Sequence, residues 1–270
     1  MKELQVQLAW NRLLAIVEEQ AQVLMRTAFS TVVREAGDLS AGVFDVNGEM
    51  LAQAVTGTPG HVNSMAEAVK KFLAKYPISK LEPGDVLLTN DPWDGTGHLN
   101  DFTVVTPVFL SSEIIGFFAS TSHIADVGGR GFGPDANDLF EEGLRVPISF
   151  LLEKGKPNKT LMELIKANVR DPLVAEGDLY SLIACNEAGS VELLEMLNDL
   201  DLRDLEELGK IILDRSKNAM REEIDSLGRH DVQYEMIVDG YDEAVRICCR
   251  MVIDQGVVDL DFSGSSPASS

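Results

Sequence analysis

Two histidine–aspartate pairs with the same spacing are the clearest sign of chemistry in this sequence. In the segment GHLND, His98 precedes Asp101 by three residues, and in SHIAD, His123 precedes Asp126 by the same interval. Imidazole nitrogens and carboxylate oxygens bind divalent metals and also act as general acids and bases. Because this spacing also arises by chance around structural histidines, a metal site needs an independent reason for the pairs to converge.

A predicted hairpin supplies that reason. The apolar runs FTVVTPVF and IIGFFAST, joined by LSSE, are typical of two buried antiparallel strands. If Phe109 pairs with Ile114, the register places Asp101 opposite Ser122, and both motifs lie at the open end of the hairpin. Their Cβ atoms would then be about 5 to 8 Å apart. Two imidazoles with carboxylates suit Zn²⁺, Mn²⁺ or Fe²⁺ better than Ca²⁺, which prefers oxygen ligands alone.

Three other residues are weaker candidates. Asp38 follows Gly37 just before a hairpin predicted around Asn47-Gly48, and it could add an oxygen ligand or simply form a turn. His61 precedes a helix predicted over residues 63–75, where it could act on a substrate or have a capping role. Arg130, within the glycine-rich segment DVGGRGFG, could meet an anionic group of a substrate.

The elements that must position these residues form a mixed pattern. Helical periodicity predicts a long amphipathic helix over residues 3–27 and two or three helices after residue 160, and three strands follow residue 232. We therefore expect an α+β fold with an N-terminal helix, antiparallel hairpins that carry the metal site, a helical middle segment and a β-rich tail. The expected parts are a mixed α/β metal-site region (1–155), a helical segment (156–230) and a β-rich region that looks truncated (231–270).

Composition restricts the partners. The chain has 23 Lys and Arg against 44 Asp and Glu, a formal charge of −21, so nucleic acid and anionic membranes are not expected as partners. No targeting segment or membrane span is apparent. The three cysteines, Cys185, Cys248 and Cys249, lie in apolar helical or strand patterns and are expected in the core. The sequence therefore favours a soluble protein of the reducing cytoplasm.

Several longer segments carry a family resemblance. REAGDLSAGVFDVNGEMLAQ, GTPGHVNSM, PGDVLLTNDPWDGTGHLNDFTVVTPVF and TSHIADVGGRGFGPDA resemble the hydantoinase B/oxoprolinase family, and EEGLRVP, NVRDP and VDLDFSGSS are similar too. The likeness extends over essentially the whole chain. Family members are longer, so the resemblance leaves open whether this chain is active alone.

The resemblance implies an ATP-dependent reaction. Family members are B-type subunits that open cyclic amides such as hydantoins, 5-oxoproline and lactams after an A-type partner subunit, which binds ATP, has phosphorylated the carbonyl oxygen. The chain would thus belong to a hetero-oligomer and complete the hydrolysis with a metal-bound water. The resemblance also implies the metal ligands Asp38, His98, Asp101 and His123.

Some roles remain open. Asp126 is expected to orient a ligand or to take a proton from water, and His61 is the other candidate catalytic residue. Relatives in acetone and aryl ketone carboxylases make a carboxylase subunit the first alternative function. The second alternative is an inactive remnant that only binds or assembles with a partner.

Overall fold

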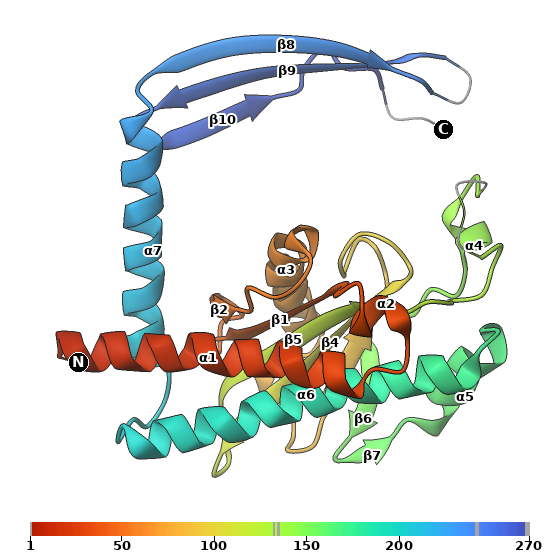
Figure 1. The fold of residues 1–270 in the computed structure, drawn as a ribbon, viewed down its shortest axis with the longest axis vertical. Coiled ribbons are helices and arrows are strands. Elements are labelled where there is room, and N and C mark those ends of the chain that lie inside the picture. The colour runs from red at the N-terminus through yellow and green to blue at the C-terminus, as the bar shows by residue number, and fades with distance from the viewer. Residues whose placement is uncertain (1, 132, 134–135, 241–242, 268–270) are drawn as a thin grey trace. The chain divides into compact units, whose positions relative to one another are not determined.

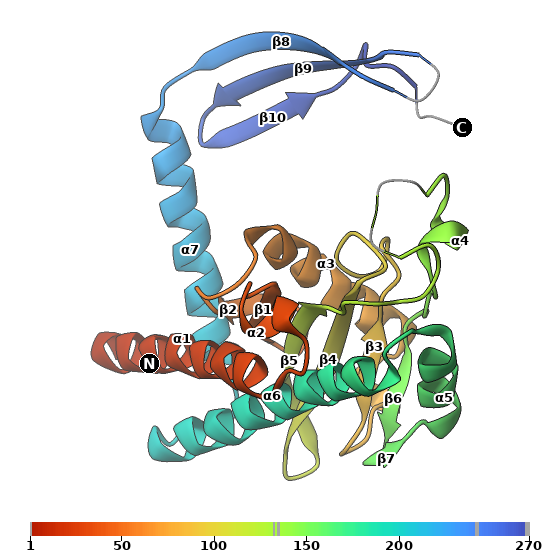
Figure 2. The ribbon, with the colours of Figure 1, turned by 45° about the vertical axis from the view of Figure 1, so that its right-hand side comes forward.

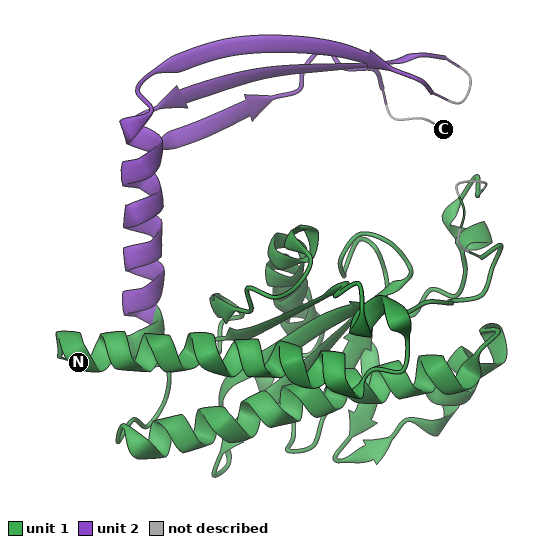
Figure 3. Cartoon of the chain, in the orientation of Figure 1, with its two compact units in different colours: residues 1–209 green, residues 210–270 purple. Residues whose placement is uncertain are grey.

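The computed structural model describes residues 2–131, 133, 136–240 and 243–267, which form two compact units, residues 1–209 and 210–270 (Figure 3). The fold is mixed α+β, as predicted. The helices are α1 (Glu3–Thr27), α2 (Thr31–Arg34), α3 (Pro59–Lys75), the 3₁₀ helix η1 (Ile78–Lys80), α4 (Leu139–Glu142), α5 (Lys159–Asn168), α6 (Pro172–Asp199) and α7 (Glu206–Ser226). The strands are β1 (Leu39–Phe44), β2 (Met50–Gln53), β3 (Val86–Thr89), β4 (Asp101–Leu110), β5 (Glu113–His123), β6 (Ser149–Glu153), β7 (Lys156–Pro157), β8 (His230–Val238), β9 (Val245–Asp254) and β10 (Val257–Asp261).

Unit 1 is built on an antiparallel seven-stranded sheet in the order β2-β1-β5-β4-β3-β6-β7. Helices α1 and α6 lie side by side across one face, and α3 covers the other (Figures 1 and 2). Each face has its own apolar core, because the central strands are buried on both sides. The core under α1 and α6 includes Leu24, Phe102 and Leu182, and the core under α3 includes Phe44, Met65, Phe72 and Phe117.

Buried amides join α1, α6 and the centre of the sheet. Gln20 Nε2 donates to Asn186 Oδ1 at 2.8 Å and to the carbonyl of Ala119 at 3.1 Å. Asn186 Nδ2 donates in turn to the carbonyl of Val104 at 3.2 Å. Since buried polar groups are costly when unpaired, this network fixes how the helix pair sits on β4 and β5. It thereby holds the strands that carry the two histidine–aspartate motifs.

Unit 2 contains most of α7 and the three-stranded sheet β10-β9-β8. The turn at Gln255-Gly256 joins β9 to β10, and Gly256 has φ +71°. A Cβ at Gly256 would lie 2.9 Å from the carbonyl oxygen of Arg221, so only glycine allows this turn to approach α7 so closely. The three strands predicted after residue 232 are confirmed.

The later helices are divided between the two units. Helices α5 and α6 belong to unit 1, because α6 packs against α1, β4 and β5, whereas most of α7 belongs to unit 2. Helical periodicity alone does not say which sheet a helix covers. Within the described part of the chain, no helix has the length and apolar character that crossing a membrane requires.

Candidate metal centre

Three neighbouring strand ends bring the candidate ligands together. Strand β1 pairs with β5 so that Leu39 lies opposite Ser122, and the backbone N–H of His123 donates to the carbonyl of Asp38 at 3.2 Å. Strand β4 begins at Asp101, directly after the loop that carries His98. Asp38, Asp101 and His123 therefore lie at the same end of three adjacent strands of the sheet.

The register of the β4–β5 hairpin differs by one residue from the prediction. Phe109 pairs with Ile114 as expected, but a bulge follows, and Val108 pairs with Gly116. Asp101 consequently lies directly opposite His123 rather than opposite Ser122. Because an extra residue on one strand reverses the face of every later side chain, the bulge places Asp101 and His123 on the same face.

Helix α3 adds His61 to this face. The helix begins at Pro59 rather than at the predicted residue 63, because proline is favoured at the first helical position. His61 thus lies inside the first turn, on the buried side that also carries Met65 and Phe72. The predicted location in front of the helix was wrong, and the His61 side chain faces the strand ends.

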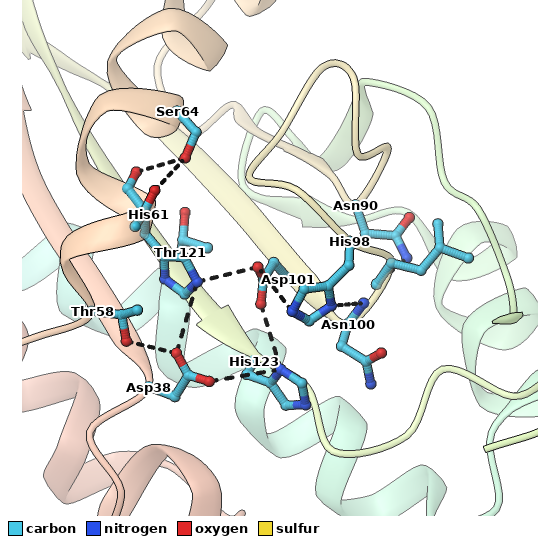
Figure 4. Close-up of polar contacts among 12 residues, drawn as sticks. Asp38, Thr58, His61, Ser64, Asn90, His98, Asn100, Asp101, Thr121 and His123 are labelled. Atoms are coloured by element: carbon cyan, nitrogen blue, oxygen red, sulfur yellow. Dashed lines mark hydrogen bonds and ion pairs between the residues drawn. The ribbon is translucent and has the colours of Figure 1, made fainter. Parts of the chain in front are cut away.

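The side chains converge, as Figure 4 shows. His98 Nε2 lies 3.4 Å from Asp101 Oδ2, and His123 Nδ1 lies 3.6 Å from Asp101 Oδ1 and 3.8 Å from Asp38 Oδ2. His61 Nε2 lies 3.2 Å from Asp101 Oδ2 and 3.7 Å from Asp38 Oδ1. One ligand atom from each of His98, Asp101 and His123 can be chosen so that all three lie within 4.8 Å of one another.

This donor set fits a divalent cation. Asp101 is 1% exposed, and no hydrogen bond of normal geometry satisfies either of its carboxylate oxygens within the described residues. A buried carboxylate flanked by imidazoles, with neither oxygen in a hydrogen bond of normal geometry, is costly, and a cation bound between it and the imidazoles would remove that cost. Two imidazoles and two carboxylates match the preferences of Zn²⁺, Mn²⁺ and Fe²⁺. This metal identity stays a prediction.

The electrostatics of the cluster favour an ionised Asp101 carboxylate and a protonated His61 imidazole. Burial by itself would raise the pKa of Asp101, but His123 and His61 outweigh it and lower that pKa to about 2. Burial would lower the pKa of His61, yet the carboxylates of Asp101 and Asp38 outweigh it and raise that pKa above its ordinary value. Asp101 is therefore ionised near neutral pH, and His61 holds a proton readily.

Asp126 lies outside the cluster of Asp38, His61, His98, Asp101 and His123, although its motif has the same spacing as that of Asp101. Its Oδ1 accepts from the Arg170 guanidinium at 2.6 Å and from the Gly128 N–H at 3.0 Å, and its Oδ2 accepts from the Arg170 N–H. These donors outweigh burial and lower the pKa of Asp126. Its catalytic role stays untested, but because its oxygens already have partners in Arg170 and Gly128, we favour a role in holding the loop.

The glycine-rich loop after β5 is held by the same arginine. Arg170 donates to the carbonyls of Gly128 and Gly129, and both glycines have positive φ. Arg130, predicted to meet an anionic group, lies 3.2 Å from Glu141 through its Nε. The loop is thus held by α4, through Glu141, and by the segment between α5 and α6, through Arg170.

Two positioning residues were missed by sequence reasoning. Thr58 Oγ1 donates to Asp38 Oδ1 at 2.7 Å, and Asn90 binds three backbone groups, at Leu99, Leu144 and Val146. Both lie in polar loops, where hydroxyl and amide side chains also occur simply as turn formers. The only available signal for Thr58 was its position just before Pro59 at a helix start.

Comparisons with known proteins agree with this fold. 5-oxoprolinase 1 of Arabidopsis thaliana is 29% identical over 286 residues, which cover 95% of this chain and 22% of that protein. The crystal structure of ATP-dependent caprolactamase from Pseudomonas jessenii matches with a TM-score of 0.85 and 24% identity, over 96% of this chain and 46% of that one. A nucleotide-free structure of acetone carboxylase matches with a TM-score of 0.85 and 20% identity, over 98% of this chain and 38% of that one.

These matches do not identify a single reaction. The chain spans less than half the length of each of the three proteins. Two other relatives are named as single subunits, one of a D-/L-hydantoinase and one of a caprolactamase, so relatives of this kind work with partner subunits. The hydantoinase B/oxoprolinase family matches residues 2–270, which include both histidine–aspartate motifs. The chain belongs to the hydantoinase B/oxoprolinase family.

Proposed function

We propose that this chain supplies the metal centre of an ATP-dependent cyclic amide hydrolase. The substrate would be a hydantoin, 5-oxoproline or a lactam, activated by phosphorylation of its carbonyl oxygen on an A-type partner subunit that binds ATP. The observation that carries the proposal is the buried Asp101 carboxylate, which lies among three imidazoles and whose oxygens accept no hydrogen bond of normal geometry from any residue that the structure describes. Relatives that are 5-oxoprolinases and a caprolactamase support the substrate class.

The residues of the cluster divide into ligands and a proton carrier. Asp38, His98, Asp101 and His123 would hold the metal, because their nitrogens and oxygens converge at one end of the sheet. When bound, a divalent metal supplies Lewis acidity and makes water more acidic near neutral pH. His98 is the most exposed member, with its side chain 47% accessible, so the centre can be reached from solvent on that side.

His61 is the group that would hold or accept a proton. Its Nε2 lies between the carboxylates of Asp101 and Asp38, which raise its pKa against the effect of burial. An imidazole with this environment can take a proton from attacking water or return one to the ring nitrogen that leaves. Thr58 would position Asp38, because its hydroxyl donates to one carboxylate oxygen while the other carboxylate oxygen faces His123.

The direct test is reconstitution with an A-type subunit. The mixture, supplied with ATP and a divalent metal, is expected to open hydantoin, 5-oxoproline or a lactam, and the variant His61→Asn is expected to lose most of that activity. A variant at an exposed histidine outside the cluster, His230→Asn, is the control. If the complex uses ATP without opening any cyclic amide, the proposed function is wrong.

The same assay separates a second candidate. The structural match to acetone carboxylase favours a ketone carboxylase as the alternative reaction on the same scaffold. Bicarbonate-dependent consumption of ATP with acetone or an aryl ketone would select the carboxylase. Tight binding of the A-type partner with no turnover of either substrate class would instead select a role in assembly.

A further inference from the structure

A cavity adjoins the cluster on the side of the sheet that α3 covers. Its volume is about 400 Å³, within the range of small-molecule pockets, and it lies between the start of β1, the end of β2, the loop after β2 and the first turns of α3. Ser40 lines the cavity, and its Oγ lies 3.6 Å from Met65 Sδ of α3, just as Asp38 Oδ1 lies 3.7 Å from His61 Nε2 of the same helix. Thr58 also lines the cavity and donates to Asp38. The cavity and the cluster therefore share a wall.

The loop between β2 and α3, which forms this wall, is held in place by the rest of unit 1. The N–H of Thr58 donates to the carbonyl of Leu39 at 2.8 Å. Glu18 of α1 accepts from the N–H of Val55 at 3.0 Å and from the N–H of Thr56 at 3.3 Å. Because these bonds form within the chain, the cavity needs no ligand to shape it.

The lining of the cavity is uncharged and polar. All the described residues that line it are neutral, although 25% of the chain is charged. The amides of Gln53 and Asn63 bond to no other residue that the structure describes, and the buried hydroxyl of Ser40 meets only a thioether, which is a weak acceptor. A carboxamide side chain offers one acceptor and two donors, which complement the N–H and the carbonyl of a cyclic amide.

The charged side chains that bond to this lining are acidic. Glu18 accepts from Val55 and Thr56, and Asp38 accepts from Thr58. Burial would raise the pKa of Glu18, but the hydrogen bonds from Thr56 and Val55 outweigh it and lower that pKa, so Glu18 is ionised near neutral pH. A carboxylate that entered the cavity would lose water and would find no lysine, arginine or histidine side chain in the described lining.

We propose that the cavity holds the uncharged ring of the substrate, with Gln53 and Asn63 as its hydrogen-bonding residues. The chain then selects hydantoins and lactams over 5-oxoproline, whose ring carries a carboxylate. This inference rests on the proposed hydrolysis of a cyclic amide at the metal centre and names the substrates that the centre favours. The shared wall at Thr58 keeps a ring in the cavity beside Asp38.

Two ligands form a matched pair, because 2-pyrrolidinone and 5-oxoproline differ only in the carboxylate. The full chain, free of metal so that the carboxylate has no ion to bind, would be titrated with each ligand and followed by ligand-observed NMR. We expect 2-pyrrolidinone to bind at least about tenfold more tightly than 5-oxoproline. Gln53→Leu and Asn63→Leu should each weaken its binding by about fivefold, because each removes hydrogen bonds of an amide. Gln7→Leu, at an exposed glutamine of α1 outside the cavity, is the control.

A charge introduced at Gln53 gives a result that loss of folding does not imitate. Gln53→Arg is expected to strengthen the binding of 5-oxoproline by about tenfold, because a guanidinium pairs with a carboxylate. No binding of either ring, equal affinities of the wild type for the two rings, or affinities that the Gln53 and Asn63 variants leave unchanged would overturn the inference. Failure of the proposed hydrolysis would appear instead as use of ATP without ring opening in the reconstituted complex, so the two failures are distinguishable.

Discussion

The two histidine–aspartate motifs have the same spacing, but their aspartates meet different surroundings. His98 and Asp101 both turn toward the cluster, whereas in the second motif only His123 does so. Asp126 lies beyond the end of β5 and binds Arg170 and Gly128. A carboxylate whose oxygens already accept well-formed hydrogen bonds holds structure together, whereas a buried one without a hydrogen bond of normal geometry is available to a cation. The hydrogen-bond state of the carboxylate, rather than the motif, is therefore our reason for proposing different roles for Asp101 and Asp126.

The largest difference between the motifs is expected in catalysis. Asp101→Asn removes the central charge of the cluster, so activity of the reconstituted complex should fall by about 100-fold or more. Asp126→Asn should keep most of the activity, because its oxygens bond the loop rather than the cluster. Steady-state rates at saturating substrate would measure both variants, with circular dichroism to check folding. A comparable loss in the two variants would contradict the proposed division of roles.

The second difference is expected in stability. Asp126→Asn weakens the bonds to Arg170, and we expect the free energy of unfolding to fall by about 1 to 2 kcal/mol, since the guanidinium is partly exposed. Urea denaturation would measure this loss. Arg170→Gln should cost a similar amount, and the double variant should cost less than the sum of the two. Additive effects would show that the two side chains do not act together.

A smaller effect is expected where a hydroxyl supports a ligand. Thr58→Val removes the hydrogen bond to Asp38, and metal affinity should fall by about tenfold. The helix start should be unaffected, because the Thr58 side chain makes no capping hydrogen bond to α3. The matched control is Thr27→Val, which removes a hydroxyl that donates to the carbonyls of Val23 and Leu24 within α1. Equal affinities for metal in the two variants would exclude Thr58 as a support of Asp38.

The smallest effect is expected in the pH dependence of the metal-free protein. Burial opposes protonation of His61, but Asp101 and Asp38 raise its pKa above 6.5, so its protonated form contributes stability below that pH. The contribution is lost as the pH rises through the folded-state pKa. Between about pH 6 and about pH 9, the Tm should therefore fall more for the wild type than for His61→Asn. Identical pH profiles would mean that the two carboxylates do not hold this proton.

Much of this arrangement is predictable from the sequence, and the remainder depends on tertiary contacts. The strand pair and its convergent motifs follow from apolar runs and a short turn. The bulge between Val108 and Phe109 does not, because a one-residue insertion leaves the apolar pattern of both strands intact. The closeness of Asp38 depends on the pairing of β1 with β5, which are far apart in sequence. The sequence pattern alone therefore leaves Asp38 as either an extra oxygen ligand or a turn residue, and the family resemblance is what implies a metal ligand.

The sequence also did not allow a prediction of the orientation of the His61 side chain or of the hydrogen-bond partner of Asp126. The start of α3 lies four residues before the predicted one, which puts His61 inside the first turn on the buried side, and helix starts are predicted less well than helix interiors. Arg170 lies between α5 and α6, so its bond to Asp126 spans two elements with no shared pattern. Such contacts arise only when α6 packs against the sheet.

The most direct test of the central claim is the metal content of three purified proteins after loading with Zn²⁺, Mn²⁺ or Fe²⁺ and removal of free metal. Mass spectrometry of the metal should find about one ion per chain in the wild type and in Asp126→Asn, and none in Asp101→Asn. A wild-type protein that retains no metal, or an Asp101→Asn variant that retains as much as the wild type, would contradict the assignment of Asp101 to the centre of a metal site.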